Sequence, residues 1–367
     1  MLQMRTATSS SSSAPLVDPL VSELVDVDDD PEAFFALTLE RGWGDGLPLI
    51  PPTEARVRAM LTATPYHAED VIVELPPGRR AATVELAAVN AVLAGCEPVG
   101  FPFVIAALEA IGVSEFNAFG LTTTTSSVHP ALIVNGTSRD EARIDYGPGC
   151  MGGAAGRGSM TIGRAASLCL RNIGGQRVGT NSKSVFGQPA RTGLCFGEWE
   201  ERSPWPSLAV QYGFSPTDDV VTVHAGKGTM PLADTNNDDP RDLAYLVAKT
   251  VAFPLSNKFL TPTAASGQMV LAINPIWAER FGREFPAIED FQAYLWEHCW
   301  QPASLWPLAN QLVLERHGRI DPDGRVRLCA RPDQLVVIVC GGLGSLHAIC
   351  LPSWGESELQ SQAVVHA

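Results

Sequence analysis

The chain has 367 residues, which is enough for one large domain or two ordinary ones, and its 45% hydrophobic residues can form a sizeable core. Its formal net charge of -14 argues against nucleic acids and anionic membrane surfaces as partners. The 8 cysteines include no Cys-X-X-Cys pair, so they fit neither a zinc ribbon nor a small secreted disulfide scaffold. We expect a cytoplasmic protein with a small-molecule substrate, and we also expect a homo-oligomer.

The N-terminal residues 1–30 contain a serine run and the acidic stretch VDVDDD. They predict a disordered tail without the apolar segment of a secretory signal. Asp30-Pro31 opens a helix that ends near Arg41, and Thr53 caps a second helix that ends at Leu61. The apolar region 81–113 is interrupted by polar residues and prolines. It therefore predicts two buried helices, 82–94 and 101–112, and not a membrane span.

Strands alternate with helices along the rest of the chain, which predicts an α/β or α+β fold with a mixed sheet core and flanking helices. The expected strands are 71–75, 116–125, 131–135, a short one at Cys195, 220–224, 268–273, 326–329 and 335–340, and the later helices are 240–252, 275–283 and 288–300. A change in composition near residues 200–217 predicts two closely packed lobes, 31–205 and 206–355, followed by a polar tail, 356–367. The acidic cluster of Glu198, Glu200 and Glu201 is expected to be a solvated face.

Glycines are densest between Asp145 and Gly175, in a loop that precedes an expected helix. Such a loop lets a ligand approach the main chain closely, and a helix N-terminus is suited to bind an anion. Ser159 is a natural N-cap for this helix. The residues that we expect to bind a substrate are Gly149, Gly153, Arg157, Ser159, Thr161 and Arg164. The alternative is a surface loop before an ordinary amphipathic helix.

Cys150 is the first candidate for chemistry, because main-chain N–H groups and Arg157 near a helix start can stabilise a thiolate. The other cysteines are expected in the core. A thiolate needs a base and an orienting group, and His129, His347 and Asp45 can supply them if they meet Cys150 in space. His129 ends a hydroxyl-rich segment, His347 follows a glycine turn, and Asp45 lies between two glycines. Turn formation or structural hydrogen bonding explains each of these residues as well.

Other kinds of site find little support in the sequence. His129, His224 and His347 lack a ligand spacing such as HxxxH, so no metal is predicted. The chain contains no GxxxxGKS/T or GxSxG motif and no dinucleotide fingerprint, so the sequence names no cofactor. An anionic substrate would still find local positive charge at Arg157, Arg164 or Arg191.

A set of long motifs occurs in this order along residues 35–355: GWGDGLPLIPPT, AGCEPVGFP, HPALIVNG, the Gly-rich loop leading into MTIGRA and RNIGG, FGQPARTGLCFGE, SPWPSLAVQYGF, and GGLGSLHA with PSWG. In these motifs the chain resembles a family of largely uncharacterised bacterial proteins associated with UGSC-type selenoproteins. The latter are small thiol or selenol proteins named for a Sec-Gly-Ser-Cys motif. The resemblance implies a site in the Gly-rich loop.

This chain departs from the family pattern at one helix start, where similar proteins carry P-E-H-A and this one reads Pro275-Ile276-Trp277-Ala278. A role for that histidine is therefore not carried over. The chain has no selenocysteine position, so the resemblance implies a partner or substrate-binding subunit if the family does redox chemistry with a selenoprotein.

We therefore expect an enzyme that acts on a small anionic or carbonyl-bearing metabolite. Cys150 would act as a nucleophile or redox thiol with His129 or His347 as its base, and the class stays open between lyase, transferase and oxidoreductase. The alternative is a non-catalytic subunit that binds a substrate or a small thiol or selenol protein. The absence of a complete standard catalytic motif favours that alternative.

Overall fold

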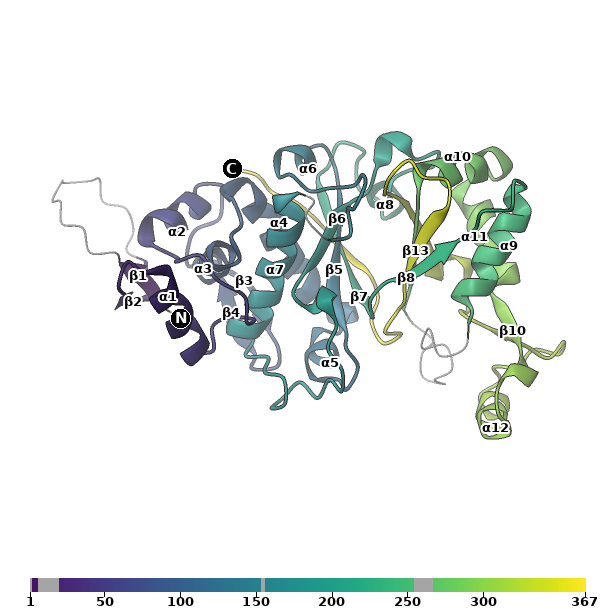
Figure 1. Cartoon of the computed structure of the whole chain (residues 1–367), viewed down its shortest axis with the longest axis horizontal. Coiled ribbons are helices and arrows are strands. Elements are labelled where there is room, and N and C mark those ends of the chain that lie inside the picture. The colour runs from purple at the N-terminus through teal and green to yellow at the C-terminus, as the bar shows by residue number, and fades with distance from the viewer. Residues whose placement is uncertain (1, 6–19, 153–155, 254–266) are drawn as a thin grey trace.

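The computed structural model describes residues 2–5, 20–152, 156–253 and 267–367, and two four-stranded sheets form its centre (Figure 1). The first sheet has the order β14-β7-β5-β6 and consists of β5 (His129–Asn135), β6 (Leu194–Gly197), β7 (Val220–Gly226) and β14 (Gln360–Ala363). The second has the order β12-β9-β13-β8 and consists of β8 (Met230–Ala233), β9 (Met269–Ile273), β12 (Leu335–Val339) and β13 (His347–Leu351). Each sheet joins parallel and antiparallel strands, which confirms the predicted mixed α/β class.

Helices cover the outer face of each sheet (Figure 1). The first sheet is covered by α4 (Phe101–Gly112) and α7 (Arg157–Asn172), with α3 (Val84–Ala94) packed against α7. The second is covered by α9 (Pro240–Val251), α10 (Pro275–Glu284) and α11 (Ile288–His298). Within the described ranges no single helix has the length and apolar character to cross a membrane, although the bent pair Pro98–Gly112 and Ser114–Thr123 together meets that test.

Strand side chains alternate between two different cores. In β5, Leu132 and Val134 join the core beneath the first set of helices, whereas Ala131 and Ile133 join a core between the two sheets. Val336 and Ile338 of β12 reach the same central core from the other side. The molecule is therefore a four-layer stack of helices, sheet, sheet and helices. Because both faces of each sheet are covered, β5, β7, β9 and β12 are buried along their whole length.

The chain crosses between the sheets twice. It leaves the first sheet after β7 and returns to it at β14, which pairs antiparallel with β7. The expected boundary between lobes at residue 206 therefore does not separate the two sheets, because β7 of the first sheet follows it. The expected polar tail, 356–367, supplies the edge strand β14. At the other terminus, β1 (Leu2–Arg5) pairs in parallel with β2 (Glu23–Asp26). Residues 6–19 of the tail that was predicted to be disordered lie outside the described residues.

Most expected elements occur near their expected bounds, including α1 (Pro31–Glu40) and α2 (Glu54–Leu61), which Asp30 and Thr53 cap. The strand expected at 116–125 is wrong, because this segment forms α5 (Ala118–Thr123). Its hydroxyls bond back to carbonyls one turn earlier, Thr122 to Ala118 and Thr123 to Phe119. The remaining elements are the hairpin β3 (Val71–Leu75) and β4 (Arg80–Thr83), the short helices α6 (Ser138–Glu141) and α8 (Leu208–Gln211), and a projection of β10 (Trp300–Pro302), α12 (Leu308–Arg316) and β11 (Arg325–Arg327).

Candidate functional site

The loop that carries Cys150 is fixed to both sheets. The amide of Gly197, at the end of β6, donates to the carbonyl of Asp145 at 2.9 Å, and the amide of Gly341, just after β12, donates to the carbonyl of Tyr146 at 2.7 Å. Gly149 has a φ of +78°, a left-handed conformation that favours glycine. The loop therefore lies where the carboxyl ends of β5, β6 and β12 meet, between the two sheets.

A cavity of about 350 Å³ opens beside this loop, and we call it the thiol cavity. Its wall comes from the Cys150 loop and from the second sheet, and it is made mainly of glycines and small or apolar side chains. Its lining residues are Gly149, Cys150, Met151, Gly152, Ala272, Asn274, Cys340, Gly341, Gly342, Gly344, His347, Ala348 and Ile349. The structure thus brings Cys150 and His347 to one cavity although they are far apart in sequence.

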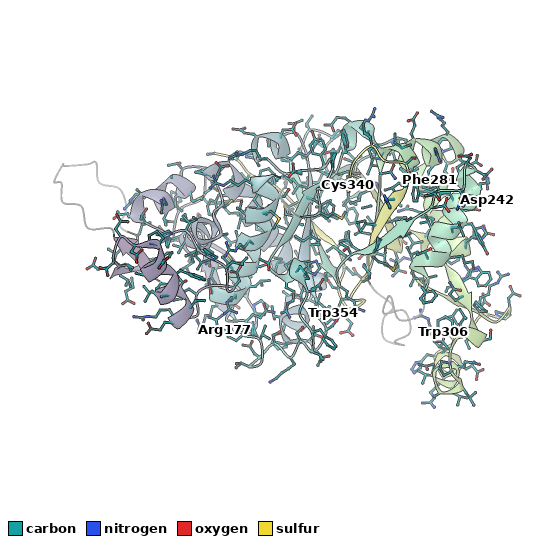
Figure 2. All side chains as sticks on the ribbon, in the orientation of Figure 1. Arg177, Asp242, Phe281, Trp306, Cys340 and Trp354 are labelled. Carbon is teal, nitrogen blue, oxygen red and sulfur yellow. The ribbon has the colours of Figure 1, made fainter. Side chains whose placement is uncertain are left out.

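Two thiols meet in this cavity. Cys340 follows β12 at the boundary between the sheets (Figure 2), and it lines the same cavity as Cys150. A hydrogen bond from the Cys340 thiol to the Cys150 thiolate lowers the pKa of Cys150; burial opposes this effect, and main-chain N–H groups of Gly341 and Cys150 support it. The same contact, together with burial, raises the pKa of Cys340 well above its ordinary value. Cys150 is therefore the thiol of the pair that ionises first.

The other cysteines are poor nucleophiles by comparison. All 8 cysteines are free and buried. Burial raises the pKa of Cys96, Cys329 and Cys350 to about 12, and it raises the pKa of Cys169, Cys195 and Cys299 further. Cys150 is the cysteine for which hydrogen bonds outweigh burial and lower the pKa. The role that the sequence predicted for Cys150 stays a prediction.

Asn274 and His347 hold one edge of the thiol cavity together. The side-chain amide of Asn274 donates to the carbonyl of His347 at 2.5 Å, and its side-chain oxygen accepts from the amide of Trp277 at 2.9 Å, as the N-cap of α10. The first of these bonds joins the end of β9 to the start of β13. The His347 side chain is exposed, so its ring is open to solvent and to a substrate.

The start of α7 differs from the expected anion site. The helix begins at Arg157 with Gly156 as its N-cap, and Ser159, which was predicted to be the cap, instead accepts a hydrogen bond from the amide of Asp145 at 2.8 Å. The amide of Gly156 donates to the Asp145 carboxylate, and that of Gly158 to the carbonyl of Arg143. These amides are therefore satisfied within the chain.

The other residues expected near this helix start also have partners inside the protein. Arg157 donates to the carbonyl of Gly95 at 2.9 Å and pairs with Glu97 at 3.1 Å, so it is not part of the thiol cavity. Thr161 donates to the carbonyl of Arg157 at 2.9 Å. Gly153 lies outside the described residues.

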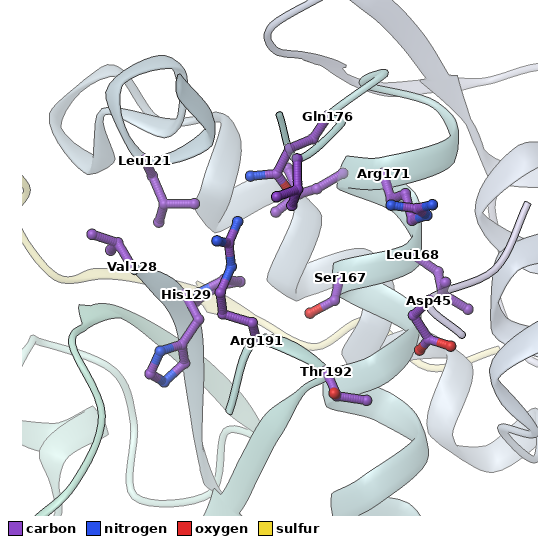
Figure 3. A pocket seen from close by; sticks show the side chains of 13 residues that line it. Asp45, Leu121, Val128, His129, Ser167, Leu168, Arg171, Gln176, Arg191 and Thr192 are labelled. Atoms are coloured by element: carbon purple, nitrogen blue, oxygen red, sulfur yellow. The ribbon is translucent and has the colours of Figure 1, made fainter. Parts of the chain in front are cut away.

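Asp45 and His129 line a different cavity, of about 180 Å³ (Figure 3). Arg164 holds the Asp45 carboxylate with two hydrogen bonds, at 2.7 and 2.8 Å. Burial raises the pKa of Asp45, but the hydrogen bonds and charge of Arg164 outweigh burial and lower it below 3.8. Because His129 begins β5 and the Cys150 loop lies at the other end of that seven-residue strand, the two cavities are about 20 Å apart. The structure therefore separates Asp45 and His129 from Cys150.

His129 is buried as a neutral ring. Burial, the neighbouring His224 and the charge of Arg191 lower its pKa to about 3. Its ring packs on Gly226, where an added Cβ would lie 3.2 Å from the ring. A base role toward Cys150 would need hydrogen-bond reach, which this placement does not give.

Glu198 is the residue that the sequence interpretation placed wrongly. It is 1% exposed and not part of a solvated face. Its carboxylate accepts from the Asn135 amide at 2.7 Å and from the main chain of Leu208 at 2.8 Å, and burial raises its pKa to about 7. The negative charge of Glu198 also raises the pKa of Cys340. Its position directly after the buried strand LCFG was the signal available in the sequence.

The fold and cavity define a four-layer α/β protein with a thiol pair between its sheets. Among the residues that the structure describes, no group of three or more His, Cys, Asp or Glu side chains is placed to hold a metal ion. No protein-family model matches the chain, and no curated protein sequence matches it. The resemblance to the family associated with UGSC-type proteins stays a prediction.

Proposed function

We propose that this protein is a thiol-dependent enzyme that acts on a small substrate in the thiol cavity, with Cys150 as its nucleophile. The observation that carries the proposal is that Cys150 and Cys340 line one cavity large enough for a small molecule. A thiolate that is stabilised by a neighbouring donor and faces a cavity is the arrangement that thiol catalysis requires. His347 is our candidate acid–base group, because this exposed residue lines the same cavity.

The lining of the thiol cavity favours an uncharged reacting group. Among the described residues that line it, none is Lys or Arg. Anions bind poorly where no cation or free N–H group meets them. A carbonyl or a disulfide therefore suits this cavity better than a carboxylate or a phosphate.

The second thiol favours redox chemistry over simple addition to a carbonyl. In the step that we propose, the Cys150 thiolate attacks one sulfur of a small disulfide and displaces the first thiolate, which takes up a proton. Cys340 then loses its proton to the second leaving sulfur while its own sulfur attacks Cys150. The products are a Cys150–Cys340 disulfide and two small thiols, so the protein loses two electrons and the substrate gains them.

The alternative of a different class is a subunit that exchanges thiols with a small thiol or selenol protein and has no turnover of its own. The same pair, Cys150 and Cys340, would serve that role. Turnover of 2-hydroxyethyl disulfide by the purified protein, with a chemical reductant to regenerate the dithiol, would support the enzyme. Stoichiometric oxidation without turnover would support the subunit.

The test of the thiol proposal is limiting alkylation with iodoacetamide across pH, read by peptide mass spectrometry. Cys150 should be labelled first below pH 8, because its lowered pKa leaves more of it as thiolate than any other cysteine. In the presence of 2-hydroxyethyl disulfide, the Cys340→Ser variant should accumulate a mixed disulfide on Cys150, because the second thiol that would resolve it is missing. The Cys150→Ser variant should accumulate none. Labelling of Cys150 no faster than Cys195 or Cys350 would show that the proposal is wrong.

A further inference from the structure

The second cavity, of about 180 Å³, carries an excess of positive charge in a protein whose net charge is -14. We call it the arginine cavity, because Arg171 of α7 and Arg191 of the turn Pro189–Arg191 both line it. Among the lining residues that the structure describes, Asp45 is the only carboxylate, and Arg164 already neutralises it through two hydrogen bonds. The local charge is therefore positive.

Neither arginine has a carboxylate partner among the residues that the structure describes. The contact recorded for the Arg191 side chain is a long one, 3.4 Å to the Ser182 hydroxyl, and the Nε of Arg171 is buried without a partner in the described part of the chain. Burial lowers the pKa of Arg191. A half-buried guanidinium without a counter-ion is costly, and an anion bound beside it would offset that cost.

Uncharged groups of the same cavity add hydrogen-bonding capacity. The Ser167 hydroxyl is buried without a partner in the described ranges, and Figure 3 shows it pointing towards Arg191. The Arg191 side chain extends towards Gln176, whose amide is held by the carbonyl of Thr122 at 3.2 Å. Ser167, Gln176 and Arg191 all line this one cavity.

The C-terminal end of α7 lies nearby and would by itself repel an anion, because helix C-termini carry partial negative charge. Arg177 offsets this effect. Its guanidinium donates to the carbonyls of Arg171 at 2.5 Å and Gln176 at 3.0 Å. Burial lowers the pKa of Arg177, and the charges of Arg171 and Arg80 lower it further, which shows that cations gather at this end of the helix.

We propose that the arginine cavity binds a small oxyanion, with Arg191 as its main ligand and Arg171 and Ser167 as further donors. Its volume is close to that of cavities of about 150 Å³ that hold a six-atom ring, so the ligand is a small carboxylate or a phosphate. The site is separate from the thiol cavity, since it lies at the opposite end of β5. It therefore does not depend on the thiol proposal.

The experiment compares thermal unfolding and calorimetric binding of the full chain in sodium phosphate, sodium malonate and sodium chloride at equal ionic strength. Phosphate, malonate or both should raise the melting temperature above the value measured in chloride, since a ligand that binds only the folded state stabilises it. Arg191→Gln should weaken binding at least tenfold, and Arg191→Lys less. The matched control is Arg283→Gln, an exposed arginine on α10, which should bind as the wild type does.

The two salts separate the sources of the anion, because malonate alone would indicate a carboxylate ligand and phosphate alone a phosphate. Cys150→Ser should bind the anion unchanged, so failure of the thiol proposal would leave this result intact. If Arg191→Gln does not fold, Arg171→Gln and Ser167→Ala test the same site. No effect beyond that of chloride, or equal binding by Arg191→Gln and wild type, would overturn the proposal.

Discussion

Asn135 donates a hydrogen bond of 2.7 Å to Glu198, and these two residues mark the ends of neighbouring parallel strands. Asn135 is the last residue of β5, and Glu198 directly follows β6. Their contact lies between the sheets, close enough to Cys340 for the charge of Glu198 to raise the pKa of that thiol. Glu198 thus helps to keep Cys340 protonated, and a protonated Cys340 is the donor that stabilises the Cys150 thiolate.

The first prediction concerns pH-dependent stability. The pKa of Glu198 is about 7 in the folded protein and about 4.5 when free, so its contribution to stability is fully present below pH 4.5 and is lost as pH rises through 7. The loss amounts to about 3 kcal/mol. In Glu198→Gln this loss should disappear. The free energy of unfolding of the variant, measured in urea, should therefore rise relative to that of the wild type between pH 5 and 8.

The matched control for this measurement is Glu69→Gln, which removes an exposed carboxyl group. Its free energy of unfolding should run parallel to that of the wild type over the same pH range. If Glu198→Gln also ran parallel to the wild type, the carboxyl group would have to be ionised in both states, and the account of its burial would be wrong.

Sequence patterns predicted the strands well because each core strand is a short apolar run bounded by turn residues. The pattern within β5 or β12 is apolar throughout, which predicts burial on both faces but not which faces meet. The stacking of the two sheets, and the return of β14 to the first one, depend on contacts between residues far apart in the chain. No local pattern contains that information.

The candidate site was predictable only in part for the same reason. Cys150 stands out locally because of its glycines, but the group that lowers its pKa most is Cys340, which belongs to the other sheet. Glu198 has two further glutamates close by in sequence, so a local interpretation favours a solvated cluster. Glu201 is 57% exposed, as that interpretation expects, whereas Glu200 is 20% exposed, and both pair with the buried Arg139, at 2.5 and 3.1 Å.

The second prediction tests the Cys340 donor. Cys340→Ala removes the hydrogen bond to the Cys150 thiolate, and a bond to a charged group contributes about 1.5–3 kcal/mol. The midpoint pH for alkylation of Cys150 should therefore rise by about 1–2 units. Cys340→Ser keeps a hydroxyl donor and should stay close to the wild type.

The readout for Cys340 is the midpoint of the alkylation profile and not the absolute rate, because truncation to Ala also enlarges the cavity and improves access. Cys350→Ala serves as the control, since that buried thiol lies in the core beneath α9–α11. An unchanged midpoint in Cys340→Ala would mean that Cys150 owes its reactivity to the main-chain amides alone.

The third prediction concerns the glycines before and within α7. A Cβ at Gly158 would lie 1.8 Å from the carbonyl oxygen of Ala142, so this glycine allows the helix start to pack on the main chain. Gly158→Ala should cost about 1–3 kcal/mol of unfolding free energy, although Gly to Ala in a helix is normally stabilising. Gly147→Ala has open space around it and should change stability by less than about 0.5 kcal/mol. If Gly158→Ala and Gly147→Ala changed the free energy of unfolding equally in chemical denaturation, this packing role of Gly158 would be refuted.

The last prediction concerns the pair of Asp45 and Arg164, whose side chains are 16% and 14% exposed. Removing one member leaves the other charge without its partner, so Arg164→Met should cost about 2–3 kcal/mol at pH 7, and the double variant Asp45→Asn/Arg164→Met should recover part of that loss. Because the pKa of Asp45 is lowered in the folded state, the stabilisation is present above pH 3.8 and is lost as pH falls through the folded pKa. The coupling energy from a double-mutant cycle in urea should therefore shrink as pH is lowered below 3.8. A cycle with no coupling at pH 7 would show that each residue is held by its other contacts. Arg164 would then not neutralise Asp45, and the arginine cavity would carry less positive charge than we infer.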